Sequence, residues 1–330
     1  MKSNNENSNS KIMKSSLNGL AKAAIYIWRN QKALIALIAM VIVFAFISEH
    51  FFTVGNLLNV SRQTAILALL AAGMSLVILV GDIDLSIGAN AAFCGVMAAF
   101  LLKRGVGTPF TFLIILILGM LIGYINGIIV TKIKVPFFIA TLATMSILIG
   151  GGFLITGGYP ISNLPDSWSF FGRGYLGPIP IPTITIVLAF VILHVVLTKT
   201  TFGRKIYGVG SNERTAYLCG VKTENIRIMA YALCGLMAAL GGILLSSRLD
   251  SGDPSVGSVF LLTSIAAPIL GGIKLSGGEG TIIGTLIGAF VLGIINNAMS
   301  LLNLNIYWQD VVRGLIVLAV VIPQIERRKI

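Results

Sequence analysis

The sequence predicts an all-α fold, a polytopic membrane bundle of about ten transmembrane helices with both termini in the cytoplasm. Three observations support this prediction. Of the 330 residues, 56% are hydrophobic and only 11% are charged, whereas soluble domains carry about 25% charged residues. The apolar residues gather into runs that approach the roughly 20 residues needed to cross a bilayer. The lysines and arginines lie mainly in alternate segments between these runs, as the positive-inside rule describes.

Ten apolar runs divide the chain. A polar N-terminal tail, residues 1–32, precedes a transmembrane domain at 33–323, and a short C-terminal tail follows at 324–330. The runs at 88–102 and 257–272 are short, so they are either full crossings or re-entrant or tilted segments. In chain order, the predicted spans are 33–52, 63–80, 88–102, 110–131, 136–156, 180–198, 227–247, 257–272, 280–300 and 306–323.

The distribution of basic residues sets the predicted orientation. With a cytoplasmic N-terminus, 18 lysines and arginines fall in inner segments and 5 in outer segments, while Arg313 lies inside a span. Six of the inner ones belong to the loop at 199–227, the one long polar interlude of the chain. We therefore expect this loop to be cytoplasmic. Because topology accounts for the net charge of +12, no nucleic-acid partner is expected.

Two sets of glycines at four-residue spacing predict close helix packing. Residues four apart lie on one helical face. Lipid offers no hydrophobic drive for helix association, so small residues that let backbones approach supply the packing instead. The two sets are Gly119, Gly123 and Gly127, and Gly280, Gly284 and Gly288.

A short repeat indicates two related halves. Residues 81–88 read GDIDLSIG and residues 271–278 read GGIKLSGG, with identical residues at five of eight positions. Each segment ends one apolar run and opens the next, and both fall on the predicted inner side. Repeated glycine-containing interruptions in the two halves of a membrane protein indicate a transport pathway between pseudo-equivalent halves.

Five polar residues in or near the spans are candidates for the translocation path. Asp82 and Asp84 form the only acidic pair close to the bilayer, where ionisable groups are costly and usually functional. At the end of a span, however, they would equally well face water or cap the next helix. The amides of Asn126, Asn296 and Asn297 either hydrogen-bond between helices or line a polar path. A path of amides with few charges suits a neutral cargo.

The last apolar run carries a charged pair. Asp310 and Arg313 lie three residues apart and therefore share a helical face. We expect a structural ion pair here rather than a contact with substrate.

The longest predicted outer loop, residues 157–179, is rich in aromatic residues. Such residues are typical of an interfacial belt at the membrane surface, and a docking surface for an external partner is the alternative. The residues concerned are Tyr159, Trp168, Phe170, Phe171 and Tyr175.

Three stretches carry a resemblance to a known family. They are residues 73–88, GMSLVILVGDIDLSIG, residues 202–221, FGRKIYGVGSNERTAYLCGV, and residues 270–290, LGGIKLSGGEGTIIGTLIGAF, with the pair Asn296 and Asn297 following. In combination they resemble the membrane-spanning permease subunits of bacterial ABC importers for monosaccharides, of the ribose, xylose and galactose type. The similarity extends over about residues 50–320.

Two departures from the family pattern affect individual residues. Asp82 stands where the first motif usually has a second glycine. In the polar loop, Arg214 and Thr215 interrupt the alanines that usually follow the Asn212-Glu213 pair. The second departure leaves the expected fold of the loop unchanged, but it changes the side chains that the loop offers for contact with a partner.

The resemblance implies a transport subunit rather than an enzyme, with no catalytic residues, metal or cofactor of its own. The chain has no G-x-x-x-x-G-K-[ST] motif, so ATP hydrolysis is expected in a partner. The implied partners are two ATP-binding-cassette ATPase subunits, a second permease subunit that is either a copy or a paralogue, and an external sugar-binding protein. The assembly would lie in the lipid bilayer of the bacterial plasma (inner) membrane.

The resemblance also assigns a role to the polar loop. Its segment at 200–227 would sit in a groove of an ATPase subunit and couple ATP-driven closure to rocking of the bundle around a central site. The residues expected to make this coupling contact are Asn212, Glu213, Arg214, Ala216, Tyr217 and Gly220.

Two other function classes make different demands on the sequence. An ion-coupled secondary sugar carrier needs an acidic or histidine relay at mid-bilayer, and an intramembrane enzyme needs a nucleophile–base pair or a metal cluster such as H-E-x-x-H. His50 and His194 are far apart, and Cys94, Cys219 and Cys234 lack metal-ligand spacing. We therefore favour the importer subunit, which provides the path for a small neutral sugar.

Overall fold

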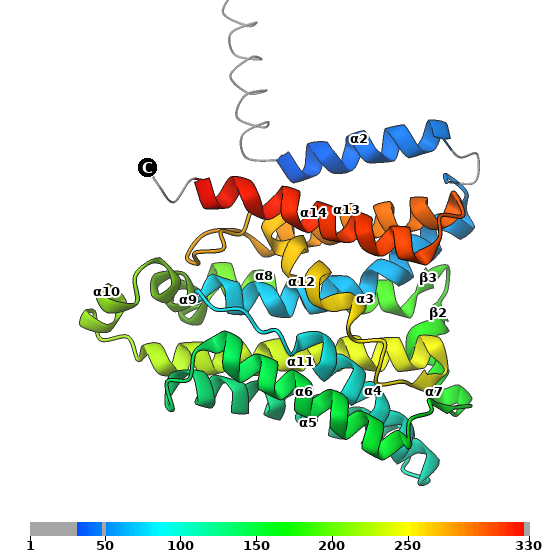
Figure 1. Cartoon of the computed structure of the whole chain (residues 1–330), viewed down its shortest axis with the longest axis horizontal. Helices are drawn as coiled ribbons and strands as arrows, with labels where there is room; N and C mark the ends of the chain where they lie inside the picture. The colour runs from blue at the N-terminus through cyan, green and yellow to red at the C-terminus, as the bar shows by residue number, and fades with distance from the viewer. Residues whose placement is uncertain (1–31, 48–50, 327–330) are drawn as a thin grey trace, which may run out of the picture.

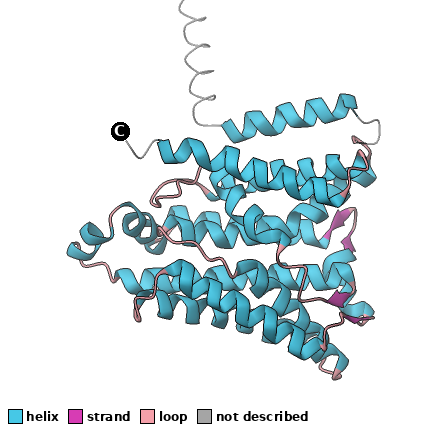
Figure 2. Ribbon diagram, in the orientation of Figure 1, coloured by secondary structure: helices cyan, strands magenta, loops and turns pink. Residues whose placement is uncertain are grey.

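The computed structural model describes residues 32–47 and 51–326, which form an almost entirely helical bundle (Figures 1 and 2). Residues 1–31 and 327–330, most of the two predicted tails, lie outside the described residues. The helices are α2 (Lys32–Ile47), α3 (Val54–Leu79), α4 (Ile87–Lys103), α5 (Thr108–Thr131), α6 (Phe137–Thr156), α7 (Asp166–Arg173), α8 (Ile181–Lys199), α9 (Thr201–Ser211), α10 (Glu213–Leu218), α11 (Thr223–Leu249), α12 (Val259–Leu270), α13 (Ile282–Leu301) and α14 (Ile306–Glu326).

Each predicted span coincides with one helix, and the all-α fold class is confirmed. Among the described residues, six helices are long and apolar enough to cross a membrane, namely α3, α5, α6, α8, α11 and α13. The runs noted as short form the shorter apolar helices α4 and α12. That all ten helices cross the membrane remains a prediction, as does the cytoplasmic placement of the termini.

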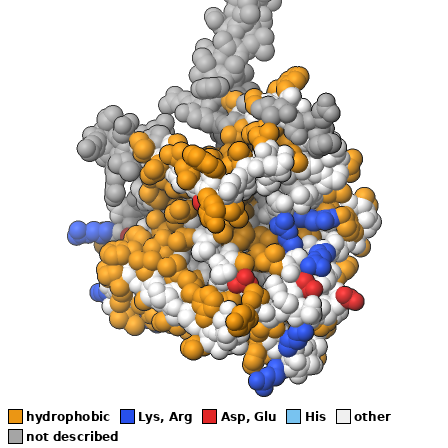
Figure 3. Space-filling model, turned by 45° about the vertical axis from the view of Figure 1, so that its right-hand side comes forward, with side chains coloured by type: hydrophobic (Ala, Val, Ile, Leu, Met, Phe, Trp, Pro, Cys, Tyr) orange, Lys and Arg blue, Asp and Glu red, His pale blue; other side chains and the backbone are white. Residues whose placement is uncertain are grey.

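The outer surface suits a lipid environment. Hydrophobic side chains cover much of the face seen in Figure 3, and most of the charged side chains that it shows lie toward one side of that face. The long helices run roughly side by side, so the bundle has two ends (Figure 1). One end carries α9 and α10 together with the start of α2 and the end of α14, and the other end carries α7 and the short strands.

Helix α11 lies at the centre of the bundle, where it packs along α5, α3 and α4. Glycines make this packing close. A methyl group at Gly123 on α5 would overlap the carbonyl oxygen of Tyr231 on α11, and one at Gly235 would overlap that of Gly119. The first predicted glycine face is therefore confirmed as the contact surface between α5 and α11.

The second glycine set is confirmed in part. Gly284 and Gly288 bring α13 against the backbone of Gly271 and Ala267 at the end of α12. Gly280 does not share that face, because α13 begins only at Ile282. Its φ of +131° lies in a region that favours glycine, so its role is in the turn before the helix.

Two small antiparallel sheets close the end opposite α9 and α10. One pairs β1 (Ile161–Ser162) with β4 (Ser251–Gly252), and the other pairs β2 (Tyr175–Leu176) with β3 (Ile179–Pro180). Together with α7 they form the predicted outer loop and the segment that follows α11.

The aromatic residues of this outer region do not form a single surface belt. Trp168 is fully buried; its indole N–H donates to Ser246 Oγ at 3.1 Å, and Ser247 Oγ donates to its carbonyl oxygen at 2.5 Å. Trp168 therefore anchors α7 to α11, because a buried indole N–H needs a hydrogen-bond partner. Tyr159, in contrast, is exposed, as a residue of the predicted belt should be.

Replacing Gly123 with alanine should destabilise the bundle, because the added methyl group meets the backbone of α11. We expect a loss of about 1–3 kcal/mol in the free energy of unfolding, as is typical of overpacking, and a lower melting temperature in detergent. Gly150→Ala on α6 is the matched control, since nothing lies within 4 Å of its added methyl group. Equal melting temperatures for the two variants would contradict the packing role of Gly123.

Candidate functional site

The polar loop at 199–227 folds into the short helices α9 and α10 at one end of the bundle (Figure 1). Asn212 separates them and caps α10, because its side-chain oxygen accepts a hydrogen bond from the N–H of Thr215 at 2.9 Å. Gly220 follows α10 with a φ of +80°, a conformation that glycine adopts without strain. Helix α10 thus has a capped beginning and a glycine turn at its end.

Helix α10 presents an apolar pair to its surroundings. Tyr217 and Leu218 are 68% and 76% exposed, and the charged residues Glu213 and Arg214 beside them are also exposed. Ala216, in contrast, is buried in the chain itself, and its expected contact with a partner stays a prediction. Within the chain it holds α10 in place, and Leu218 occupies the outward position.

An ion-pair cluster ties α10 to the interior. The Arg227 guanidinium, from the first turns of α11, donates to both carboxylate oxygens of Asp82, with Nη2 at 2.8 Å and 2.9 Å and Nε at 3.1 Å. Its Nη1 also lies 3.4 Å from Glu213 Oε1 on α10. Such a bidentate contact orders both side chains. Arg227 therefore connects α10, α11 and the link between α3 and α4.

Asp82 is the more deeply buried of the two acidic residues in this cluster. Its side chain is 6% exposed, compared with 49% for Glu213. Burial raises the pKa of the Asp82 carboxyl from its ordinary value, and the charge and hydrogen bonds of Arg227 oppose that rise. The carboxylate thus depends on Arg227, because a buried charge without a partner is costly.

The two repeated segments meet at the same end of the bundle. The N–H of Gly278, from the link between α12 and α13, donates to the carbonyl oxygen of Leu79 at the end of α3, at 3.0 Å. Gly210 on α9 sits against both of these backbone groups, since a methyl group there would overlap each of them. The Tyr207 hydroxyl on α9 donates to the carbonyl oxygen of Gly280 at 2.9 Å. Helix α9 therefore contacts the second repeat and the end of α3, just before the first repeat begins.

Asp84 and Asn126 belong to a buried hydrogen-bond network. Asp84 Oδ1 accepts hydrogen bonds from the N–H and the hydroxyl of Ser86, at 2.9 Å and 2.6 Å. Asn126 Nδ2 donates to Ser86 Oγ at 2.9 Å, and Thr144 Oγ1 donates to Asn126 Oδ1 at 2.6 Å. Asp84 thus shapes the turn that starts α4, and Asn126 joins α5 to α4 and α6.

The neighbouring asparagines of α13 have different surroundings. Asn297 is buried and exchanges two hydrogen bonds with Asn56 on α3, at 3.0 Å and 2.8 Å. Its contacts are those of a link between helices. Asn296 lies instead at a hollow, where its Oδ1 accepts a hydrogen bond from Arg313 Nε at 3.1 Å. Of the five candidates for the translocation path, Asn296 is the one that lines this hollow.

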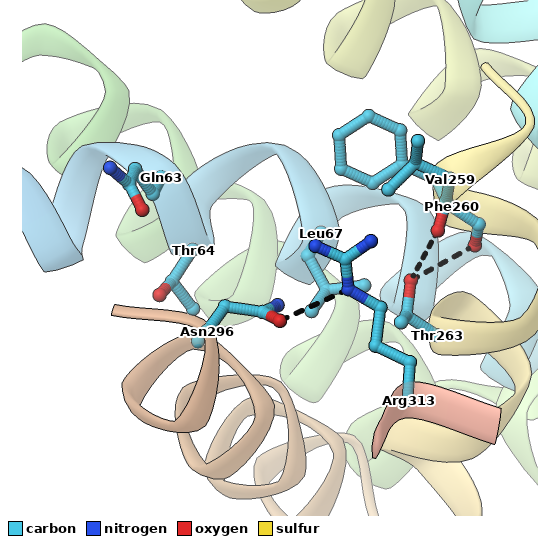
Figure 4. A pocket seen from close by; sticks show the side chains of 9 residues that line it. Gln63, Thr64, Leu67, Val259, Phe260, Thr263, Asn296 and Arg313 are labelled. Atoms are coloured by element: carbon cyan, nitrogen blue, oxygen red, sulfur yellow. Dashed lines mark hydrogen bonds between the residues drawn. The ribbon is translucent and has the colours of Figure 1, made fainter. Parts of the chain in front are cut away.

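The hollow lies between α3, α12, α13 and α14 (Figure 4). Arg313 also pairs with Asp310 at 2.6 Å, so the ion pair predicted for the last run is confirmed. We call this feature the polar hollow, and its lining residues are Gln63, Thr64, Leu67, Val259, Phe260, Thr263, Gly293, Asn296 and Arg313.

Sequence reasoning missed two parts of this arrangement. It treated Arg227 only as a cation that sets topology, although the replacement of a glycine by Asp82 was a sign that a counter-charge was needed nearby. Thr64 carried no signal, because a single threonine in an apolar run is ordinary. Among the described residues, no three or more His, Cys, Asp or Glu side chains gather closely enough to hold a metal ion.

Comparisons with known proteins give a consistent result. Residues 56–321 match the family model described as branched-chain amino acid transport system / permease component. The ribose import permease protein RbsC of Bacillus subtilis (strain 168) is 44% identical over 297 residues, covering 89% of this chain and 92% of the relative. The RbsC protein of Escherichia coli (strain K12) is 40% identical over 297 residues, with the same coverage of each chain.

A second kind of relative is named for a different cargo. The autoinducer 2 import system permease protein LsrC of Photorhabdus luminescens is 38% identical over 298 residues, covering 89% of this chain and 90% of the relative. No solved structure matches this sequence significantly.

Replacing Arg227 with glutamine should destabilise the protein strongly, because it leaves the buried Asp82 carboxylate without a counter-charge. Breaking a buried pair in this way costs about 3–5 kcal/mol, whereas an exposed pair contributes about 0–1 kcal/mol. Lys274→Gln, which breaks the exposed Lys274–Glu279 pair, is the matched control in thermal unfolding. Adding Asp82→Asn to Arg227→Gln should restore much of the loss, and no recovery in the double variant would count against the pair.

Proposed function

The chain belongs to the permease-component family that its residues 56–321 match, and we propose that it forms the path for a small neutral sugar in an ATP-driven importer. The observation that carries this proposal is the 44% identity to a ribose import permease over nearly the whole length of both chains. The family description names amino acids, but the relatives with high identity and coverage import ribose or autoinducer 2.

The proposed complex has several subunits. Two ATP-binding-cassette ATPase subunits bind at the end that carries α9 and α10, and a second permease, either a copy of this chain or a paralogue, completes the membrane part. An external sugar-binding protein delivers the cargo at the opposite end. The complex lies in the bacterial inner membrane, and α9 and α10 face the cytoplasm in accordance with the basic residues around them.

Helix α10 is the proposed contact with the ATPase. Its exposed Tyr217 and Leu218 offer the kind of aromatic and apolar anchor that dominates protein interfaces, and Glu213 and Arg214 provide a charged rim. Asn212 and Gly220 determine where the helix begins and ends. Ala216, which is buried in the chain itself, would support the helix from behind this contact.

The proposed mechanism relies on the short path from α10 to both halves of the bundle. Movement of α10 would displace Arg227 and, through its ion pair, Asp82 in the link between α3 and α4. Movement of α9 would displace the second repeated link and the end of α3, because Gly210 contacts their backbones without an intervening side chain. ATP-driven closure of the ATPase subunits would therefore change the positions of α3, α4, α12 and α13 together, as alternating access requires.

Replacing Tyr217 and Leu218 together with serine should reduce ATP-driven sugar uptake by roughly tenfold or more, because the interface loses its apolar anchors. The measurement is uptake of labelled ribose into vesicles that contain the chain with its ATPase and binding protein. Cys219→Ser, an exposed substitution next to the pair, is the control and should transport as the wild type does.

Two outcomes of this experiment would count against the proposal. Normal uptake by the double variant would remove α10 as the coupling element. Uptake that continues without ATP and follows the proton gradient would favour the ion-coupled secondary carrier instead, and Asp82, Asp84 and Asp310 would then be the residues to test.

A further inference from the structure

Three arginines gather at the end of the bundle that carries α7 and the short strands (Figure 1). They are Arg62 on α3, Arg173 at the end of α7 and Arg248 at the end of α11, and we call them the arginine cluster. Arg173 Nε donates to the carbonyl oxygen of Arg248 at 3.0 Å. The like charges of Arg62 and Arg248 are close enough to repel each other. Three of the five basic residues predicted on the outer side therefore converge.

The arginine cluster has no counter-charge in the described part of the chain. All ion pairs between described residues use other cations. Asp250, two residues after Arg248, instead accepts a hydrogen bond from the N–H of Leu164 at 3.0 Å. Positive charges that are held together without a counter-charge repel each other. The cluster therefore favours an anion from outside the chain.

The cluster presents free hydrogen-bond donors to such an anion. The Arg62 guanidinium lies 4.5 Å from the centre of the Tyr175 ring, a cation–π contact that holds it in place. Within the described residues its Nε is closed off without a partner, whereas its two terminal nitrogens are neither closed off nor hydrogen-bonded. The same holds for all three nitrogens of Arg248. These terminal groups can donate to a ligand as they stand.

An exposed apolar stripe begins beside the cluster and follows α8. Ser61, which precedes Arg62, shares a hydrogen bond of 2.5 Å with the hydroxyl of Thr183 in the first turn of α8. From Thr183 to Val191 the helix rises about 12 Å, and one acyl chain fills about half of the roughly 30 Å hydrocarbon core. The stripe consists of side chains that lie on one helical face and are each more than half exposed, namely Val187, Leu188, Val191 and Ile192.

A phospholipid fits both the cluster and the stripe. Phosphate oxygens accept paired hydrogen bonds from the guanidinium fork, and an acyl chain suits the apolar stripe. The exposed Tyr175 beside the cluster is the kind of residue found at the membrane–water interface. The acidic surface of another protein would reach the exposed Arg173 more readily than the partly buried Arg62 and Arg248, whereas a headgroup is small enough to reach all three.

We propose that the arginine cluster binds the phosphate group of an anionic phospholipid, one of whose acyl chains lies along the exposed stripe of α8. The lipid supplies the missing counter-charge on the side of the membrane where basic residues are otherwise disfavoured. Because the three arginines come from α3, α7 and α11, the bound headgroup links these helices. The site goes beyond the proposed function, since it does not depend on the cargo or on ATP.

The test is the melting temperature of the full chain in a mild detergent, with dioleoyl phosphatidylglycerol or dioleoyl phosphatidylcholine added. The anionic lipid should raise it by about 3 °C or more above the value with the zwitterionic lipid, because a ligand of the folded state stabilises that state. The variant Arg62→Gln with Arg248→Gln should lose most of this difference. Arg104→Gln is the matched control and should keep it, since Arg104 is also predicted on the outer side and stacks on an aromatic ring, that of Phe100, at 4.7 Å.

Further measurements identify the ligand and its site. Arg173→Gln, at the exposed member of the cluster, should also reduce the difference. Native mass spectrometry should show phosphatidylglycerol bound to the wild type and to Arg104→Gln, but much less of it bound to the double variant. Glycerol 1-phosphate, which has the phosphate but no acyl chain, should have no effect at the concentration at which the lipid acts.

Three results would overturn the lipid site. The first is an equal shift with the two lipids, and the second is a full difference that persists in the double variant and in Arg173→Gln. The third is a shift with glycerol 1-phosphate as large as that with the lipid, which would indicate a site for a soluble anion. If the arginine variants retain the lipid but no longer bind the external sugar-binding protein, the cluster is a docking surface for that protein instead. Sugar uptake is not measured, so none of these results bears on the proposed function.

Discussion

Close backbone contact around α11 is the constraint on which the structure depends. Lipid tails are as apolar as leucine side chains, so burial alone does not drive helices together in a membrane. The bundle instead relies on positions where two backbones touch. These are Gly119 and Gly123 against α11 on one side, and Gly242 against the carbonyl oxygen of Ala91 on the other. Such contacts allow little sliding, because any displacement brings backbone atoms into overlap. Helices α4, α5 and α11 therefore form one closely packed block.

Movement within such a bundle is then confined to the places where helices are interrupted. Both repeated segments are interruptions of this kind, and glycines with positive φ angles, such as Gly81 and Gly272, allow them to turn. Both lie near α9, the helix that follows α8 along the chain. The deformable joints thus lie beside α9, the helix next to α10, which is the proposed contact with the ATPase. The ion-pair cluster adds hydrogen bonds between Arg227 and Asp82 to the backbone packing at this end of the bundle.

The sequence predicted the helices well because composition and length determine them. Runs of apolar residues between charged or glycine-rich segments have few alternatives in a bilayer, and the glycine face of α5 follows from spacing alone. Individual roles were harder to predict, because the orientation of each helix is set by packing. Asn296 and Asn297 illustrate this difficulty: adjacent residues point about 100° apart on a helix, so one faces the polar hollow and the other pairs with Asn56. Arg227 and Asp82 are separated by 145 residues in the chain. The residues around each of them therefore do not predict that the two side chains are in contact.

The differences between the two repeats matter as much as their similarity. The shared glycine, isoleucine, leucine and serine residues give both segments a similar turn, but the charged positions differ. In the first repeat, Asp82 is held by Arg227 and Asp84 lies in a buried network. In the second, the aligned positions are Gly272 and Lys274, and Lys274 makes only an exposed pair with Glu279. Exposed pairs contribute little, so the Asp82–Arg227 pair stabilises the first link more than the Lys274–Glu279 pair stabilises the second. Helices α12 and α13, which the second link joins, also line the polar hollow. The second link therefore joins the two helices on either side of the polar hollow, whereas the first link is fixed by its ion pair to α11.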